Sequence, residues 1–250
     1  MVTGKTIWVL GATSDLGRAL ILQLASNGNY IVASARSPEK LQRLAQQHND
    51  FIKVLPLDIV CNDSVALAKG KLQQLSKFLD IVVYCTDSCE TITTVNELNF
   101  KQIMEENLFG LVRCLQLSKF LLLKSQSPQL AIITNLVSGV PQLHSQVYGA
   151  ANAAMDYFIQ SIRDDKNLAP LAITSVKVDF LTDAIPPGVF PFPFGMSKQL
   201  MAEQIIKAIS SRKAFLEVPS RLYIFFQMLG FFKFSWINSL MYKITHLHGR

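Results

Sequence analysis

A phenol and a carboxamide stand four residues apart in the segment VYGAANAAMDYF, at Tyr148 and Asn152. Helical spacing would place both side chains on one face, about one turn apart. A phenol can give a proton to a substrate oxygen, and a carboxamide can hydrogen-bond a hydroxyl group. A tyrosine on an apolar helix is also a common core residue. Other features of the chain must therefore decide whether the pair does chemistry.

A turn near the start of the chain has the composition of a phosphate-binding site. In WVLGATSDLGRALILQL, Gly11 and Gly17 follow a predicted strand and open a helical pattern. Glycines at such a turn let the backbone approach a pyrophosphate, and the helix N-terminus supplies free amides and a positive dipole. We expect these residues to bind a dinucleotide: Gly11, Thr13, Ser14, Asp15, Leu16 and Gly17.

A basic residue, Arg36, follows the second predicted strand in the segment ASARSPEKL. A dinucleotide fold meets the adenosine ribose at this point, where an acidic residue would accept hydrogen bonds from both ribose hydroxyls. A guanidinium fork suits a 2′-phosphate instead, with Ser14 or Ser37 as helpers, so the pattern favours NADP(H) over NAD(H). The alternative is an arginine on a solvated loop.

The elements that must position these residues alternate between short β-branched runs and longer helical patterns. Strands are predicted at 6–10, 30–35, 51–57, 80–85, 130–136, 171–178 and 214–218. Helices are predicted near 16–27, 38–47, 63–77, 97–124, 147–163 and 196–210. This rhythm predicts an α/β fold, a doubly wound parallel sheet of about seven strands with right-handed crossovers and helices on both faces.

Residues 1–217 are expected to form one Rossmann-type domain. Within it, the proline- and phenylalanine-rich segment 184–196 is predicted to be a lid, because its prolines prevent a helix. Residues 218–250 are expected to form an aromatic helical extension packed on the same domain. Lysines interrupt its apolar runs, so none is long enough to span a membrane. A dimer contact, a cover over the substrate pocket, and peripheral membrane contact through 219–245 stay open as alternatives.

Composition narrows the class of protein. The 250-residue chain is half apolar, so it can bury a large core, and its net charge of +6 is spread along the sequence. No nucleic-acid partner is therefore expected. The four cysteines (Cys61, Cys85, Cys89 and Cys114) lack a metal-binding spacing and indicate free thiols and no metal site. The N-terminus lacks a signal-peptide pattern, which predicts a cytoplasmic protein, with association at a membrane surface left open.

Taken in order, these features resemble the short-chain dehydrogenase/reductase family from about residue 5 to 217. The family turn Gly-x-x-x-Gly-x-Gly is similar to the turn here, with Asp15 at the middle glycine. The resemblance implies four further cofactor contacts. They are Asp58 to the adenine amino group, Ile59 beside the adenine ring, Thr86 along the cofactor, and Thr182 near the nicotinamide carboxamide.

The same resemblance implies that Tyr148 is the general acid/base and that Asn107 supports a proton-relay water. Asn152 stands where the family has a lysine. Asparagine can still hydrogen-bond the nicotinamide ribose, but it has no charge with which to stabilise a phenolate. Tyr148 is therefore expected to stay protonated at neutral pH, and any activity should favour carbonyl reduction over alcohol oxidation.

The family's substrate-binding serine has no direct counterpart in the segment IITNLVSGVPQ. Counting back from Tyr148 reaches Asn135, whereas alignment on Gly139 reaches Leu136. Asn135 could donate its amide to a developing oxyanion, and Ser138 lies near enough to do so as well.

Two functions are compatible with these residues. The first is an NADP(H)-dependent short-chain oxidoreductase that reduces the carbonyl of a small apolar substrate. The alternative is a catalytically degenerate NADP(H)-binding protein that acts through a partner or a membrane surface. The family resemblance also implies a homo-oligomer, with the helices at 97–124 and 147–163 as candidate contacts.

Overall fold

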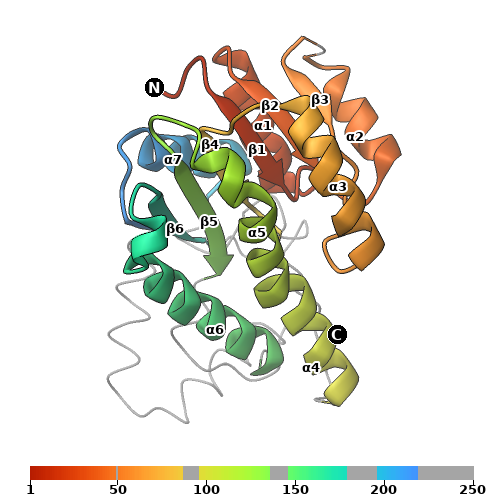
Figure 1. Cartoon of the computed structure of the whole chain (residues 1–250), viewed down its shortest axis with the longest axis vertical. Helices are drawn as coiled ribbons and strands as arrows, with labels where there is room; N and C mark the ends of the chain where they lie inside the picture. Colours follow the sequence, from red (N-terminus) through yellow and green to blue (C-terminus); the bar gives the residue numbers. More distant parts are fainter. Residues whose placement is uncertain (49, 87–95, 136–145, 179–195, 219–250) are drawn as a thin grey trace, which may run out of the picture.

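The computed structural model describes residues 1–48, 50–86, 96–135, 146–178 and 196–218. These residues contain a seven-stranded sheet with the order β3-β2-β1-β4-β5-β6-β7, and all neighbouring strands are parallel (Figure 1). The strands are β1 (Thr6–Leu10), β2 (Tyr30–Ser34), β3 (Ile52–Val54), β4 (Ile81–Tyr84), β5 (Gln129–Asn135), β6 (Ala172–Val178) and β7 (Phe215–Val218). The predicted doubly wound parallel sheet is confirmed.

Helices cover both faces of this sheet. They are α1 (Asp15–Ser26), α2 (Pro38–Ala45), α3 (Asn62–Leu75), α4 (Glu97–Met104), α5 (Gly110–Leu122), α6 (Gln146–Arg163) and α7 (Lys198–Ser210), with a short 3₁₀ turn at Lys166–Leu168. One core lies between the sheet and α1, α2 and α7, and a second lies between the sheet and α3, α5 and α6. Figure 1 shows α3, α5 and α6 on the near side of the sheet.

Serine side chains begin three of these helices. Ser14, Ser37 and Ser197 accept hydrogen bonds from backbone N–H groups in the first turns of α1, α2 and α7. Such caps satisfy donors that have no partner inside the helix and fix the residue at which the helix begins. The caps of α1 and α2 therefore set the position of the loops that follow β1 and β2.

The predicted continuous helix over 97–124 is wrong in one respect. A π-helical turn, η1 (Glu105–Phe109), separates α4 from α5. Helical periodicity alone does not reveal this turn, because a π-turn adds a single residue to an otherwise regular helix. The turn makes a tertiary contact with the sheet, because the buried Tyr84 hydroxyl shares its one proton between the carbonyl oxygens of Glu106 and Asn107.

Several predicted segments lie outside the described residues. They are the lid at 184–196 and the extension at 218–250, except for residues 196 and 218 at their borders. Among the described helices, none combines the length and the apolar character that a membrane crossing requires.

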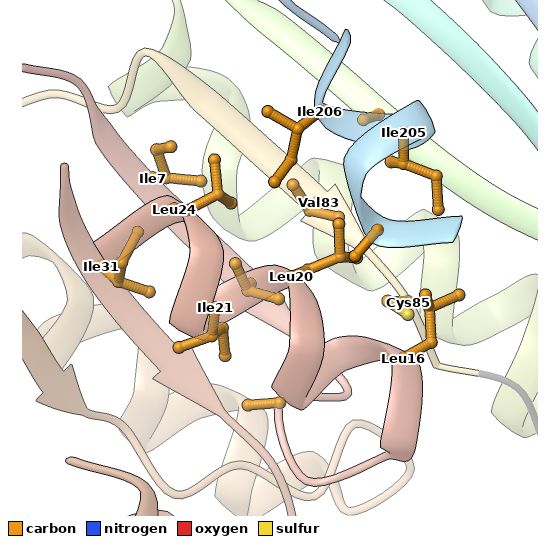
Figure 2. Packing of buried hydrophobic residues seen from close by; sticks show 14 of the residues in the cluster. Ile7, Leu16, Leu20, Ile21, Leu24, Ile31, Val83, Cys85, Ile205 and Ile206 are labelled. Carbon is orange, nitrogen blue, oxygen red and sulfur yellow. The ribbon is translucent and has the colours of Figure 1, made fainter. Parts of the chain in front are cut away.

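The packing of α1 against α7 gives a test of the first core. Leu20 of α1 is fully buried, and Figure 2 shows it among Val83 and Ile205. Leu20→Ala leaves a cavity and should lower the free energy of unfolding by about 2–5 kcal/mol in urea denaturation. Leu67→Ala, at a 66% exposed position of α3, should change it by less than about 0.5 kcal/mol. Equal losses in the two variants would contradict this packing.

Candidate active site and nucleotide cavity

A cavity of about 330 Å³ opens at the carboxyl ends of β1, β2 and β4. The strand order reverses between β1 and β4, and doubly wound folds bind their ligands at such a switch point. The lining residues are Leu10, Gly11, Thr13, Ser14, Ser34, Ala35, Arg36, Ser37, Lys40, Leu57, Asp58, Ile59, Val60, Cys85, Thr86 and Glu106. Most of the predicted adenosine-side residues therefore lie around one cavity.

The glycine turn is closely packed at two positions. Gly11 has φ +79°, and a Cβ placed on it would overlap the carbonyl group of Cys85. A Cβ on Gly17 would overlap the carbonyl oxygen of Gly11. Neither position can carry a side chain without movement of the backbone. The two glycines therefore let the turn pack directly against the backbone at the end of β4, which fixes the turn beside the cavity.

The other predicted turn residues divide into two groups. Thr13 and Ser14 line the cavity, and the Ser14 hydroxyl donates to Gly11 O at 2.9 Å and accepts from Gly17 N–H at 3.0 Å. Asp15 and Leu16 do not line it. Leu16 packs into the core. The Asp15 carboxylate is largely exposed and lies 3.7 Å from the ammonium of Lys198 on α7.

Two cations line the part of the cavity that follows β2. Arg36 and Ser37 were expected there from the sequence, and Lys40 joins them from the first turn of α2. Lys40 was missed, although its place three residues after the Ser37 cap puts it one helical turn from the loop. Two cations at one wall suit a phosphate group. The Ser37 hydroxyl between them donates its proton to the Glu39 carboxylate at 2.9 Å.

Asp58 and Ile59 lie on another wall of the cavity. The Asp58 carboxylate accepts a hydrogen bond from Val60 N–H at 3.1 Å, which orients it, and Ile59 is almost fully buried. Thr86 also lines the cavity, and its buried hydroxyl oxygen has no hydrogen-bond partner within the described residues. An apolar side chain, an oriented carboxylate and this hydroxyl suit a purine nucleoside.

Some lining residues were not predicted from the sequence. Ser34 forms part of the cavity wall, and its hydroxyl accepts a hydrogen bond from Trp8 Nε1 at 2.9 Å. Cys85 and Glu106 belong to segments far apart in the chain. Only the folded sheet brings the end of β4 next to η1, so no local signal could have identified them.

Tyr148 and Asn152 both point into the protein from α6, and each is at most 3% exposed. Asn152 accepts a hydrogen bond from the backbone N–H of Asn135, at the end of β5, at 3.1 Å. Its Nδ2 donates to the carbonyl oxygen of Tyr148, also at 3.1 Å. The carboxamide thus joins the carboxyl end of β5 to the first turns of α6. The sequence did not predict this role.

Asn107 belongs to the π-turn η1, which packs against α6. A small apolar cluster of Ile103, Val147 and Ala151 holds α4 against α6 beside this turn. The structure therefore brings four of the predicted catalytic residues to neighbouring elements, namely Asn107 on η1, Asn135 at the end of β5, and Tyr148 and Asn152 on α6.

Other predicted site residues, Ser138 and Thr182, lie outside the described residues, as do Leu136, Gly139 and Cys89. Within the described residues, no group of three or more acidic, histidine or cysteine side chains could hold a metal ion. Burial raises the pKa of the Cys114 thiol well above its ordinary range, so this cysteine stays a neutral core residue.

The chain belongs to the short-chain dehydrogenase family, whose model matches residues 5–182. A protein named uncharacterized oxidoreductase from Staphylococcus epidermidis is 29% identical over 217 residues, covering 83% of this chain and 90% of that protein. A similarly named protein from Staphylococcus aureus is 25% identical and covers 85% and 94% of the two chains. The family prediction is confirmed, and the chain is an oxidoreductase-family protein.

Solved structures of short-chain dehydrogenases share the fold of this chain. A short-chain dehydrogenase from Streptomyces avermitilis superimposes with a TM-score of 0.78 at 17% identity, covering 97% of this chain and 96% of that one. The Pseudomonas aeruginosa RhlG/NADP active-site complex gives a TM-score of 0.76 at 16% identity, with 87% and 95% covered. Family members use NAD or NADP. The closely packed turn at Gly11 and Gly17, where neither residue can carry a side chain, and the adjoining cavity fit such a cofactor.

The two hydrogen bonds by which Asn152 joins α6 to β5 can be tested by their contribution to stability. Asn152→Ala removes both hydrogen bonds at a buried site and should lower the free energy of unfolding by about 1–3 kcal/mol in urea denaturation. Gln160→Ala, on the exposed side of the same helix, should change it by less than about 0.5 kcal/mol. A loss no larger than that of the control would show that Asn152 does not hold α6 to β5.

Proposed function

We propose that this protein is an NADP(H)-dependent reductase that acts on the carbonyl group of a small apolar substrate. The observation that carries the proposal is the cationic wall of the nucleotide cavity, formed by Arg36 and Lys40 after β2. Family membership supports the oxidoreductase class. The similar RhlG structure from Pseudomonas aeruginosa is an NADP complex, which gives additional support for the choice of cofactor.

The charges around the cavity favour NADP(H) over NAD(H). The residues directly after β2 are Ala35, Arg36 and Ser37, none of which is acidic. The Glu39 carboxylate accepts a hydrogen bond from the Ser37 hydroxyl at 2.9 Å but does not line the cavity. The cavity's acidic residues, Asp58 and Glu106, come from the segment after β3 and from η1 instead. A doubly negative phosphate next to two cations gains charge-assisted hydrogen bonds that a ribose hydroxyl would not.

The chemistry of the proposed site follows from its neutral side chains. The bound cofactor supplies the hydride. Tyr148 gives its proton to the carbonyl oxygen, while Asn135 or Ser138 donates a hydrogen bond to that oxygen. No cation stands at position 152, because Asn152 is an amide engaged by the ends of β5 and α6. A phenol in such surroundings acts as an acid, so the reaction runs best towards the alcohol.

The cofactor preference predicts a selective loss in an arginine variant. Arg36→Ala should weaken NADPH binding about 10–100-fold in a fluorescence titration, because a charge-assisted contact to the 2′-phosphate is lost. Binding of NADH should change less than threefold. Arg43→Ala removes an exposed arginine from the last turn of α2, the helix that follows this loop, away from the cavity, and should leave NADPH binding unchanged. A wild-type protein that binds NADPH and NADH equally would refute the preference.

The proposed acid predicts a loss of turnover. Tyr148→Phe should reduce NADPH oxidation with apolar ketones and aldehydes about 10²–10⁴-fold, because no proton donor remains, while NADPH binding stays within about twofold. Tyr157→Phe, at a 78% exposed position of the same helix, is the matched control and should keep full activity. Tight NADPH binding by a wild-type protein that turns over no substrate of such a panel would favour the non-catalytic alternative instead.

A further inference from the structure

We propose that Tyr84 is a positioning residue, whose phenol hydroxyl holds the π-turn η1 and thereby places Asn107 next to α6. The proposal rests on the proposed function only where it treats Asn107 as part of the active site. The structure connects the Tyr84 side chain to the nucleotide cavity through Glu106, and to α6 through η1, which packs against that helix.

The hydrogen bonds of Tyr84 carry the first step. Tyr84 is fully buried at the end of β4, and its neighbours in the sheet are Leu10 of β1 and Ile132 of β5. Its hydroxyl donates to the carbonyl oxygen of Glu106 at 2.9 Å and to that of Asn107 at 3.2 Å. Both carbonyls belong to the π-turn.

The π-turn depends on such support. A π-turn is rare, because it inserts one residue into a regular helix, and it persists where outside contacts stabilise it. Here Tyr84 binds the turn from the sheet side. A second contact runs along the helix: Arg113 Nη2 lies 2.8 Å from a carboxylate oxygen of Glu105, which links α5 to the first residue of the turn. The turn is therefore held by one contact with the sheet and one with α5.

Gly110 supplies the space that the phenol needs. This residue follows the π-turn, and a Cβ placed on it would overlap the hydroxyl oxygen of Tyr84. Its own φ is not in the left-handed region, so the glycine is required for the close approach and not for backbone conformation. Tyr84 and Gly110 therefore form a matched pair, in which the hydroxyl occupies the place of a missing methyl group.

The position of Tyr84 links the cofactor to Asn107. The two residues that follow it, Cys85 and Thr86, line the nucleotide cavity, as does Glu106, which accepts its hydrogen bond. The next residue along the turn is Asn107, which is 1% exposed. A nucleotide in the cavity thus contacts residues on both sides of this hydrogen bond, so its binding should also order the turn that carries Asn107.

A double-mutant cycle tests the matched pair without any need for catalysis. Gly110→Ala should be destabilising in the wild-type chain, because the new methyl group displaces the Tyr84 hydroxyl. In a Tyr84→Phe background that hydroxyl is absent. The factor by which Gly110→Ala raises the unfolding equilibrium constant should therefore be at least fivefold smaller than in the wild-type chain. Additive effects would overturn the proposal. If Tyr84→Phe folds poorly, Gly110→Ala with Tyr84 intact still tests the pair. In that variant the backbone amides of the turn should lose protection from hydrogen exchange.

Hydrogen exchange tests the effect on the turn directly. In full-length Tyr84→Phe, amides of residues 105–110 should exchange about fivefold faster than in the wild type, because one buried hydrogen bond is lost. Adenosine 2′,5′-bisphosphate should slow this exchange in the wild type and do so less in the variant. Tyr30→Phe, at a 58% exposed position at the start of β2, should match the wild type. Unchanged exchange in Tyr84→Phe would overturn the proposal.

Kinetics separate positioning from general stability. Tyr84→Phe should lower kcat for carbonyl reduction about five- to tenfold, with the KM for NADPH unchanged within about twofold, since the cavity keeps its lining residues. Faster exchange together with an unchanged kcat would overturn the link to Asn107. If the wild type has no turnover, the proposed function fails, whereas the exchange and the double-mutant cycle still decide the role of Tyr84.

Discussion

The close approach of the turn after β1 to the end of β4 is the constraint on which the site depends. Gly11 lies so near the carbonyl group of Cys85 that no side chain fits between them, and Gly17 lies as close to Gly11. These contacts fix the backbone of the turn at the point where the strand order reverses, which is where doubly wound folds bind their ligands. The cavity, the start of α1 and the segment from Tyr84 to Thr86 all take their positions from this junction.

The part of the molecule that carries the proposed catalytic residues is held by polar contacts between elements. Asn152 connects the end of β5 to α6, and Tyr84 connects the end of β4 to the π-turn that carries Asn107. Both side chains are buried. Buried polar groups of this kind are costly unless they are hydrogen-bonded, so they define one arrangement of the strand ends and helices. Asn152 holds the structure together at a position where the family resemblance places a charged lysine.

Much of the fold could be predicted from the sequence because local patterns specify it. Alternating β-branched runs and amphipathic segments predicted all seven strands, with boundaries that differ by at most three residues from those observed. The third strand was predicted over 51–57 but ends at Val54, although the N–H groups of Leu55 and Leu57 still donate to the carbonyl oxygens of Ala33 and Ala35 beyond that point. The glycine turn, Arg36 and Asp58 were predictable too, since each belongs to a short motif tied to a strand end.

What the sequence determined by itself was the family, the parallel sheet and many of the residues after β1, β2 and β3 that line the cavity, because those depend on periodicity and on residues close together in the chain. The tertiary structure alone decided the π-turn at Glu105–Phe109, the contribution of Glu106 to the cavity, and the hydrogen bonds by which Asn152 joins β5 to α6. Each of these depends on a contact between residues far apart in the chain or on which atom a side chain presents to its neighbour. The physical reason is that a hydrogen bond depends on distance and direction, which only the folded chain supplies.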